Sequence, residues 1–181
     1  MIETDFIILT LPRSGSHMLA SALNSHPDIC CLGELFRKPP LYDWLGTGNG
    51  ITGGIVWPDN FNQVKTKKVI GLIRNPRDMA YSAVRKIGND ECYVDHALLP
   101  CSALSRDPGQ KRIDSMLRRS QALAKLLDKL PDALILTYEM ITNNMDIRIV
   151  PVEISTRICS FLGVPPYLLQ PRTYKPTVTG I

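Results

Sequence analysis

Phe6-Ile-Ile-Leu-Thr-Leu-Pro-Arg-Ser-Gly-Ser-His-Met-Leu19 is the stretch of sequence that decides the fold. Its first six residues are mostly apolar, as is typical of a strand buried in a parallel sheet. An amphipathic helix is predicted over residues 16–25, directly after the short turn Pro12-Arg13-Ser14-Gly15-Ser16. A buried strand that leads through a tight turn into a helix indicates an α/β fold, with the turn at the carboxyl end of the strand.

The turn has the chemistry of an anion-binding site. Unpaired backbone N–H groups in the first turn of a helix, together with the helix dipole, attract negative charge. Arg13 adds a full positive charge, and Ser14 and Ser16 add hydroxyl groups. Gly15 lets the backbone approach a ligand closely, because it has no side chain. We therefore predict that this turn binds phosphate or sulfate, with a plain strand-to-helix turn as the alternative.

The turn differs from a Walker A loop, which has the pattern G-x-x-x-x-G-K-[ST]. Only one glycine is present here, no lysine follows it, and an arginine precedes it. This difference argues against an ordinary ATP-hydrolysing site.

A second stretch, residues 69–82, repeats the same organisation. Val69–Ile73 is a short apolar run typical of a buried strand. Asn75 is a favourable N-cap and precedes Pro76 at the expected first position of a helix. Arg74 is thus predicted at the carboxyl end of a strand, where open α/β sheets bind their ligands, and Ser82 two turns into the helix. Alternatively, Arg74 is a surface ion-pair partner and Ser82 a solvated helix residue.

Taken together, the two stretches resemble the PAPS-dependent sulfotransferases, where PAPS is 3′-phosphoadenosine 5′-phosphosulfate, the donor of activated sulfate. Pro12–Ser16 is similar to the motif that grips the 5′-phosphosulfate in bacterial and carbohydrate-type members. Arg74-Asn-Pro-Arg-Asp78 with Ser82 matches the motif that grips the 3′-phosphate through its first arginine and its final serine. By this resemblance Arg77 is a weaker second donor.

The resemblance extends over most of the chain. The segments Asn24–Pro27 and Gly33–Phe36 are similar to a segment of the same branch whose glutamate acts as the base. The resemblance therefore implies that Glu34 is the general base, with a solvated loop glutamate as the alternative interpretation. Tyr138, in a segment similar to a strand ending in Tyr-Glu, is implied to touch the adenine. Residues 158–165 resemble the closing helix of the family.

The implied reaction is transfer of a sulfuryl group from PAPS to a hydroxyl or amine. Arg13 and the loop amides of residues 14–17 are implied to neutralise charge on the 5′-phosphate. His17 stands where the family often has threonine or tryptophan, and it is a reserve candidate for the base, as is His26. The expected partners are PAPS, its product PAP and an acceptor that is a carbohydrate, a lipid or another small molecule. A nucleotide kinase and a non-catalytic PAP-binding module are the rival hypotheses.

One departure from the family concerns the C-terminus. Members usually run longer and close a basic loop over the nucleotide, whereas here residues 173–181 lack an Arg-Lys-Gly triplet. Arg172 and Lys175 are partial substitutes. We expect a single domain over residues 1–181, of minimal or truncated type.

Composition narrows the class of protein further. With 181 residues and 44% apolar content, the chain can build one hydrophobic core. The net charge of +4 suits an anionic donor, but no cluster combines basic residues with aromatic ones as nucleic-acid binding requires. The five cysteines are odd in number and the three histidines are scattered, so we expect free thiols, a cytoplasmic location and no metal. Neither a signal peptide nor a membrane span is expected.

The predicted architecture is a three-layer α/β/α domain, similar to P-loop NTPases, with a mostly parallel sheet. Strands are expected near 5–11, 69–73 and 133–137, with one or two short ones, one of them near 54–57. Helices are expected near 16–25, 76–87, 111–130 and 152–162. Residues 37–68 and 89–110 are expected to be largely irregular. In the third helix the predicted inward-facing residues are Ile113, Met116, Leu117, Leu123, Leu126, Leu127 and Leu130.

Overall fold

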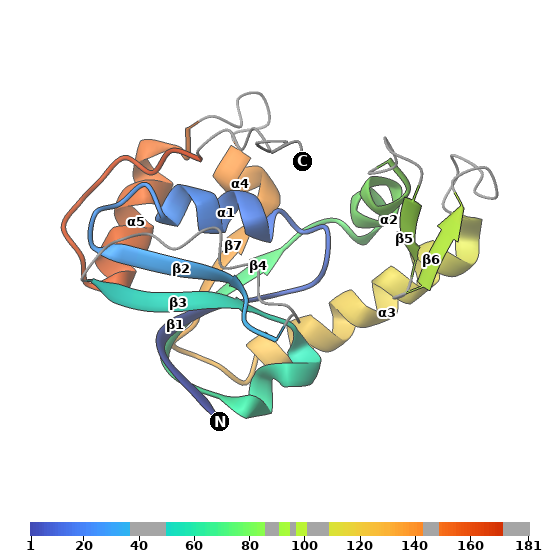
Figure 1. Cartoon of the computed structure of the whole chain (residues 1–181), viewed down its shortest axis with the longest axis horizontal. Helices are drawn as coiled ribbons and strands as arrows, with labels where there is room; N and C mark the ends of the chain where they lie inside the picture. The colour runs from blue at the N-terminus through green and yellow to red at the C-terminus, as the bar shows by residue number, and fades with distance from the viewer. Residues whose placement is uncertain (37–49, 86–90, 95–96, 101–108, 143–148, 172–181) are drawn as a thin grey trace, which may run out of the picture.

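Five parallel strands form the central sheet, in the spatial order β2-β3-β1-β4-β7 (Figure 1). They are β1 (Ile2–Thr10), β2 (Ile29–Glu34), β3 (Ile51–Val56), β4 (Val64–Ile73) and β7 (Leu134–Thr137). The computed structural model describes residues 1–36, 50–85, 91–94, 97–100, 109–142 and 149–171. The sequence-based expectations for Arg172 and Lys175, for the cysteines 92 and 101 and for the histidine 96 concern side chains or residues outside this description.

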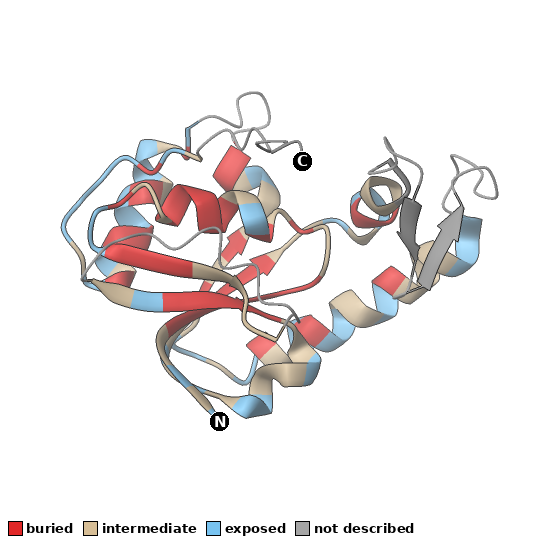
Figure 2. Ribbon diagram, viewed as in Figure 1, coloured by how far each residue is buried: buried red, intermediate tan, exposed pale blue. Residues whose placement is uncertain are grey.

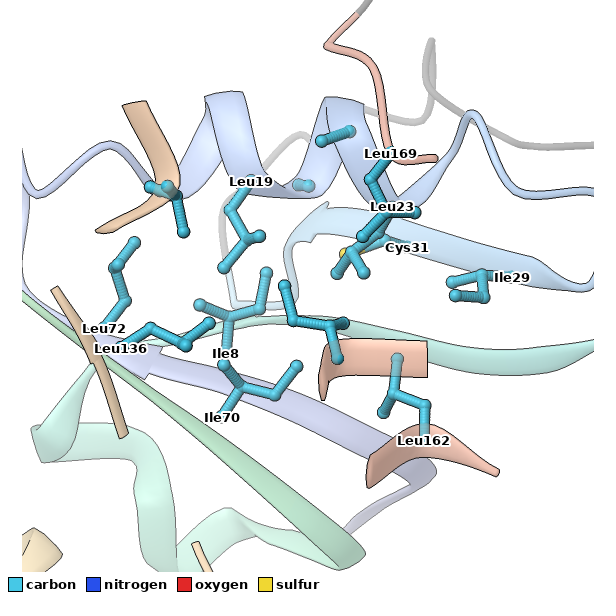
Figure 3. Packing of buried hydrophobic residues seen from close by; sticks show 14 of the residues in the cluster. Ile8, Leu19, Leu23, Ile29, Cys31, Ile70, Leu72, Leu136, Leu162 and Leu169 are labelled. Carbon is cyan, nitrogen blue, oxygen red and sulfur yellow. The ribbon is translucent and has the colours of Figure 1, made fainter. Parts of the chain in front are cut away.

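β1 is the middle strand of the sheet and is covered on both faces. Residues 6–9 have no exposed surface, because helices lie above and below the strand (Figure 2). On one face lie α1 (Ser16–Leu23), α4 (Tyr138–Thr142) and α5 (Val152–Leu162). There Leu19 and Leu23 of α1 point toward Ile8 and Ile70 of the sheet (Figure 3). Burial of this apolar surface is the main stabilising term of the layer.

The other face is covered by α2 (Pro76–Arg85), α3 (Gly109–Leu127) and the 3-10 helix η2 (Pro58–Gln63). Met79 of α2 and Leu123 and Leu127 of α3 pack here against Ile7 and Leu9 of β1. The expected three-layer α/β/α architecture is therefore confirmed, and all the strands that pair in the central sheet are parallel.

Two expectations for segments without clear periodicity were wrong in part. Within residues 37–68, the stretch 50–68 holds β3, η2 and the start of β4, and residues 37–49 lie outside the described part. β3 is glycine-rich because the ring of Phe6 lies where a Cβ on Gly53 would stand, 2.4 Å from its nearest atoms. Within residues 89–110, β5 (Glu91–Val94) and β6 (Ala97–Pro100) form an antiparallel pair. Strands of four residues are too short to show a clear alternation of polar and apolar residues, so the sequence did not predict them.

The third predicted helix is shifted and carries one wrong assignment. α3 begins at Gly109 and ends at Leu127, so Leu130 lies beyond it. Leu117 is 46% exposed rather than buried. The N-terminal part of α3 extends beyond the sheet toward β6, so it has no sheet to pack against there (Figure 1).

The order of the strands determines where a ligand can bind. β1 leads into α1 on one face of the sheet, and its neighbour β4 leads into α2 on the other. The chain therefore diverges at the carboxyl ends of two adjacent strands. This is the switch point at which open α/β sheets bind ligands, and both sequence motifs lie there.

Candidate nucleotide-binding site

The turn after β1 is held by a buried network of hydroxyl groups. Thr10 donates a hydrogen bond to the carbonyl oxygen of Leu72 in β4 at 2.7 Å. Its oxygen also pairs with the hydroxyl of Ser14, which is 1% exposed. Because the single proton of Thr10 is used on Leu72, the hydroxyl of Ser14 is the donor in this pair. The side chains of Ser14 and Thr10 thus fix the turn. The role of Thr10 was not predicted, because nothing in the sequence distinguishes it from other strand residues.

The backbone of the turn takes two left-handed conformations in close succession. The φ angle is 69° at Arg13 and 94° at Gly15, and Gly15 is the N-cap of α1. Within the described structure, the first turn of α1 has neither a side-chain cap nor an acidic residue. Its N–H groups and the positive end of the helix dipole are therefore not neutralised by the cap or by a first-turn carboxylate. This backbone geometry is compatible with a bound anion at the turn.

Arg13 and Arg74 bring the two motifs together. The Nη2 group of Arg13 donates to the hydroxyl of Ser82 at 3.0 Å, and the Nη1 group of Arg74 donates to the backbone oxygen of Arg13 at 3.1 Å. Arg13 of the first motif therefore contacts Ser82, the last residue of the second motif. Arg74, the first residue of the second motif, contacts Arg13 in return. Sequence reasoning expected these residues at one edge of the sheet but did not predict the direct contacts between them.

The charge of this pair is not balanced by an acidic side chain in the described part of the chain, where the salt bridges involve neither arginine. The Nε atoms of Arg13 and Arg74 are buried and have no hydrogen-bond partner there. Burial, and then the nearby charge of Arg74, lower the pKa of Arg13. Two converging guanidinium groups with unused donors are suited to a bound anion, which would supply both the charge and the acceptors.

Tyr138 completes the cluster from a third strand. It follows β7 as the first residue of α4, rather than ending a strand as its sequence suggested. The guanidinium carbon of Arg74 lies 3.9 Å from the centroid of the Tyr138 ring. The same ring lies against Gly15, where an added Cβ would be 2.5 Å from Cδ2.

His17 and Glu34 form a second polar pair near the start of α1. The Nε2 atom of His17 lies 3.5 Å from Oε1 of Glu34, and their side chains are 48% and 17% exposed. Glu34 is the last residue of β2, not a loop residue. β2 is fixed to the end of α1 because the Asn24 side chain bonds to both the N–H and the oxygen of Cys31. These bonds anchor the strand that carries Glu34 to the end of α1.

Other candidates lie outside this cluster. His26, the other reserve candidate for the base, is buried and is bonded to the backbone of Pro165 and Asp28, so it packs the turn before β2. The guanidinium of Arg77 lies 5.9 Å from the ring centroid of Tyr81. Asn75 caps α2 as predicted, since its side chain accepts a hydrogen bond from the Arg77 N–H.

The described residues contain no group of three or more His, Cys, Asp or Glu side chains placed to hold a metal ion. None of their helices has both the length and the apolar character needed to cross a membrane.

Solved structures with a similar fold include two sulfotransferases. The chain is similar to mouse sulfotransferase SULT7A1 complexed with PAP, at 17% identity and a TM-score of 0.50 over 90% of this chain and 59% of that one. It is also similar to the sulfotransferase domain of the Synechococcus PCC 7002 olefin synthase, at 19% identity and a TM-score of 0.55 over 88% of this chain and 73% of that domain.

The chain thus spans less than two thirds of the length of the mouse enzyme. No protein-family model matches the sequence, and no curated protein does either. At this level of identity the similarity establishes the fold. The chain has the P-loop-like α/β fold of the sulfotransferases, with both sequence motifs at the carboxyl edge of its parallel sheet.

Proposed function

We propose that this chain is a PAPS-dependent sulfotransferase domain that transfers a sulfuryl group to a hydroxyl or amine of an acceptor. The observation that supports it best is the pair of reciprocal contacts between the two motifs, from Arg13 to Ser82 and from Arg74 to Arg13. They bring two cations with unused donors to the switch point of the sheet. The bound PAP of the mouse sulfotransferase supports the choice of nucleotide.

In this proposal the turn binds the 5′ end of the donor and the second motif binds its 3′ end. The backbone N–H groups of residues 14–17, with Gly15 allowing close approach, hold the 5′-phosphosulfate at the start of α1, and the side chain of Ser16 lies within that turn. Arg13 neutralises charge that develops on the bridging oxygen. Arg74 and Ser82 hold the 3′-phosphate, with Arg77 as a weaker second donor.

Glu34 is the proposed general base, with His17 beside it. The acceptor oxygen or nitrogen attacks sulfur, the bond between sulfur and the bridging oxygen breaks, and PAP leaves with that oxygen. The acceptor proton passes to the Glu34 carboxylate. The 3.5 Å approach of His17 to Glu34 supports this assignment, because an imidazole beside the carboxylate helps to fix its orientation. No metal ion is required in this scheme.

Acceptor class and location are further parts of the proposal. The Pro-Arg-Ser-Gly-Ser turn and the Gly33-Glu34 pair favour the bacterial and carbohydrate-type branch, so carbohydrates are the first acceptors to screen, followed by lipids and other small molecules.

The buried free thiols of Cys30, Cys31 and Cys159 support a reducing, cytoplasmic location.

Calorimetric titration with PAP, 5′-AMP and ATP·Mg²⁺ tests the donor assignment. We expect micromolar affinity for PAP and much weaker binding of the other two, since only PAP carries the 3′-phosphate. A preference for ATP·Mg²⁺ would instead indicate a kinase. PAP binding without sulfuryl transfer across the acceptor screen would indicate a non-catalytic PAP-binding module.

The variant Arg74→Ala is expected to weaken PAP binding by about 1.5–3 kcal/mol, the usual contribution of a hydrogen bond to a charged group. The affinity for 5′-AMP should hardly change, because it lacks the phosphate that Arg74 contacts. Arg118→Ala, on the exposed side of α3, is the matched control and should alter neither affinity. An equal loss for both nucleotides contradicts the assignment of Arg74.

A further inference from the structure

We propose that Tyr138 is a positioning residue that holds the guanidinium of Arg74 in place, and that it thereby determines the preference of the site for 3′-phosphorylated nucleotides. This inference rests on the proposed function, since it concerns the same nucleotide site. It replaces the expected contact between Tyr138 and adenine with a contact to a protein cation.

The register of the sheet places the two residues side by side. Ile73 at the end of β4 is paired with Thr137 at the end of β7. Arg74 and Tyr138 are the next residues of their chains, so they leave the sheet at the same level. The backbone of Tyr138 is held in turn, because its carbonyl oxygen accepts a hydrogen bond of 3.0 Å from the Thr142 hydroxyl.

The ring of Tyr138 is confined between two parts of the site. The Arg74 guanidinium carbon is 3.9 Å from the ring centroid, well inside the range of a cation–π interaction. The ring also touches Gly15, where an added Cβ would lie 2.5 Å from Cδ2 and 2.7 Å from Cε2. The face that carries Arg74 is therefore not available to adenine while Arg74 stays in place.

Besides the ring contact, one hydrogen bond holds the Arg74 guanidinium in the described part of the structure. One nitrogen donates to the Arg13 carbonyl oxygen at 3.1 Å, and Nε has no partner in the described part of the structure. The neighbouring Arg13 carries the same charge and repels it. The negative face of the Tyr138 ring offsets this repulsion in the absence of a ligand. A guanidinium that is already oriented loses less freedom when a phosphate binds, which raises the affinity for that phosphate.

The first test needs no nucleotide. In nuclear magnetic resonance spectra of the free protein, the Nε–H signal of Arg74, assigned with Arg74→Lys, should show an upfield ring-current shift. Tyr138→Phe, which keeps the aromatic face, should retain the shift, and Tyr138→Leu should abolish it. An unshifted signal in the unmodified protein would show that Tyr138 does not hold Arg74, and would overturn the proposal.

The second test compares PAP and 5′-AMP by calorimetry. Tyr138→Leu should weaken PAP binding by about 3- to 30-fold, the range expected for loss of a cation–π contact, and change 5′-AMP binding less than about twofold. Tyr138→Phe should keep the PAP affinity within about twofold. Tyr167→Leu, which removes a ring that faces His26 instead, is the matched control and should behave like the unmodified protein.

Each other outcome has a definite meaning. An equal loss for both nucleotides in Tyr138→Leu indicates contact with the shared adenosine and overturns the proposal, as does an unchanged PAP affinity. If Tyr138→Leu does not fold, Tyr138→Met replaces it, since it fills a similar volume without an aromatic face. If the unmodified protein binds neither nucleotide, the proposed function and the 3′-phosphate role both fail, while the ring-current test still decides whether Tyr138 positions Arg74.

Discussion

Glu34→Gln is expected to lower turnover at least about 100-fold, the usual effect of losing a general base. Glutamine has the shape of glutamate but does not accept the acceptor's proton at neutral pH. The affinity for PAP should change less than about twofold, because Glu34 ends β2, which β3 separates from β1, and takes no part in the hydrogen bonds of Arg13, Arg74 and Ser82. PAP release from PAPS in the presence of an acceptor and calorimetry with PAP measure the two quantities.

Glu153→Gln, an exposed residue in the first turn of α5, is the matched control for the same chemical change outside the site. Full turnover in Glu34→Gln would remove Glu34 from the mechanism. If His17→Gln then lost activity instead, the proton acceptor would be His17. A parallel loss of PAP affinity in Glu34→Gln would mean that the carboxylate supports the nucleotide site rather than the chemistry.

Gly15→Ala is expected to destabilise the protein by about 2–5 kcal/mol and to abolish PAP binding. The φ angle of 94° costs an L-residue about 1–2 kcal/mol, and the overlap of the new Cβ with the Tyr138 ring adds about 1–3 kcal/mol of overpacking. Urea unfolding measures the loss of stability, and calorimetry measures the loss of binding. The turn or Tyr138 must move in this variant, and either movement disturbs the anion site.

Gly109→Ala separates the two causes. Gly109 has a similar φ angle of 70°, but a Cβ there would meet no atom of the described residues within 4 Å, so we expect this variant to carry the backbone cost alone. The double variant Gly15→Ala with Tyr138→Leu should recover part of the lost stability, since the overlap is removed. Equal destabilisation by Gly15→Ala and Gly109→Ala would show that the ring of Tyr138 yields without cost.

Much of the architecture was predictable because the decisive segments carry strong local signals. The apolar runs of β1 and β4, and the cap at Asn75, place two strands and two helices with small errors at their ends. β4 begins earlier than expected, at Val64, because its polar first half is stabilised by pairing with the start of β1 and not by its own composition. The first half of β3 was missed for a related reason, since Gly53 makes room for Phe6 and Gly54 for Leu35.

For the candidate site, the sequence by itself determined which residues gather at the carboxyl edge of the sheet. Arg74 directly follows β4, Arg13 lies in the turn after β1, and the ends of parallel strands meet at one edge. Only the tertiary structure decided how these residues contact one another. Three contacts define the site: the buried hydrogen bond between Thr10 and Ser14, the hydrogen bond from Arg13 to Ser82, and the cation–π contact of Arg74 with Tyr138. The last two join atoms from different strands and helices. Local sequence patterns reflect the preferences of neighbouring residues, whereas such contacts depend on strand order, register and packing between distant segments.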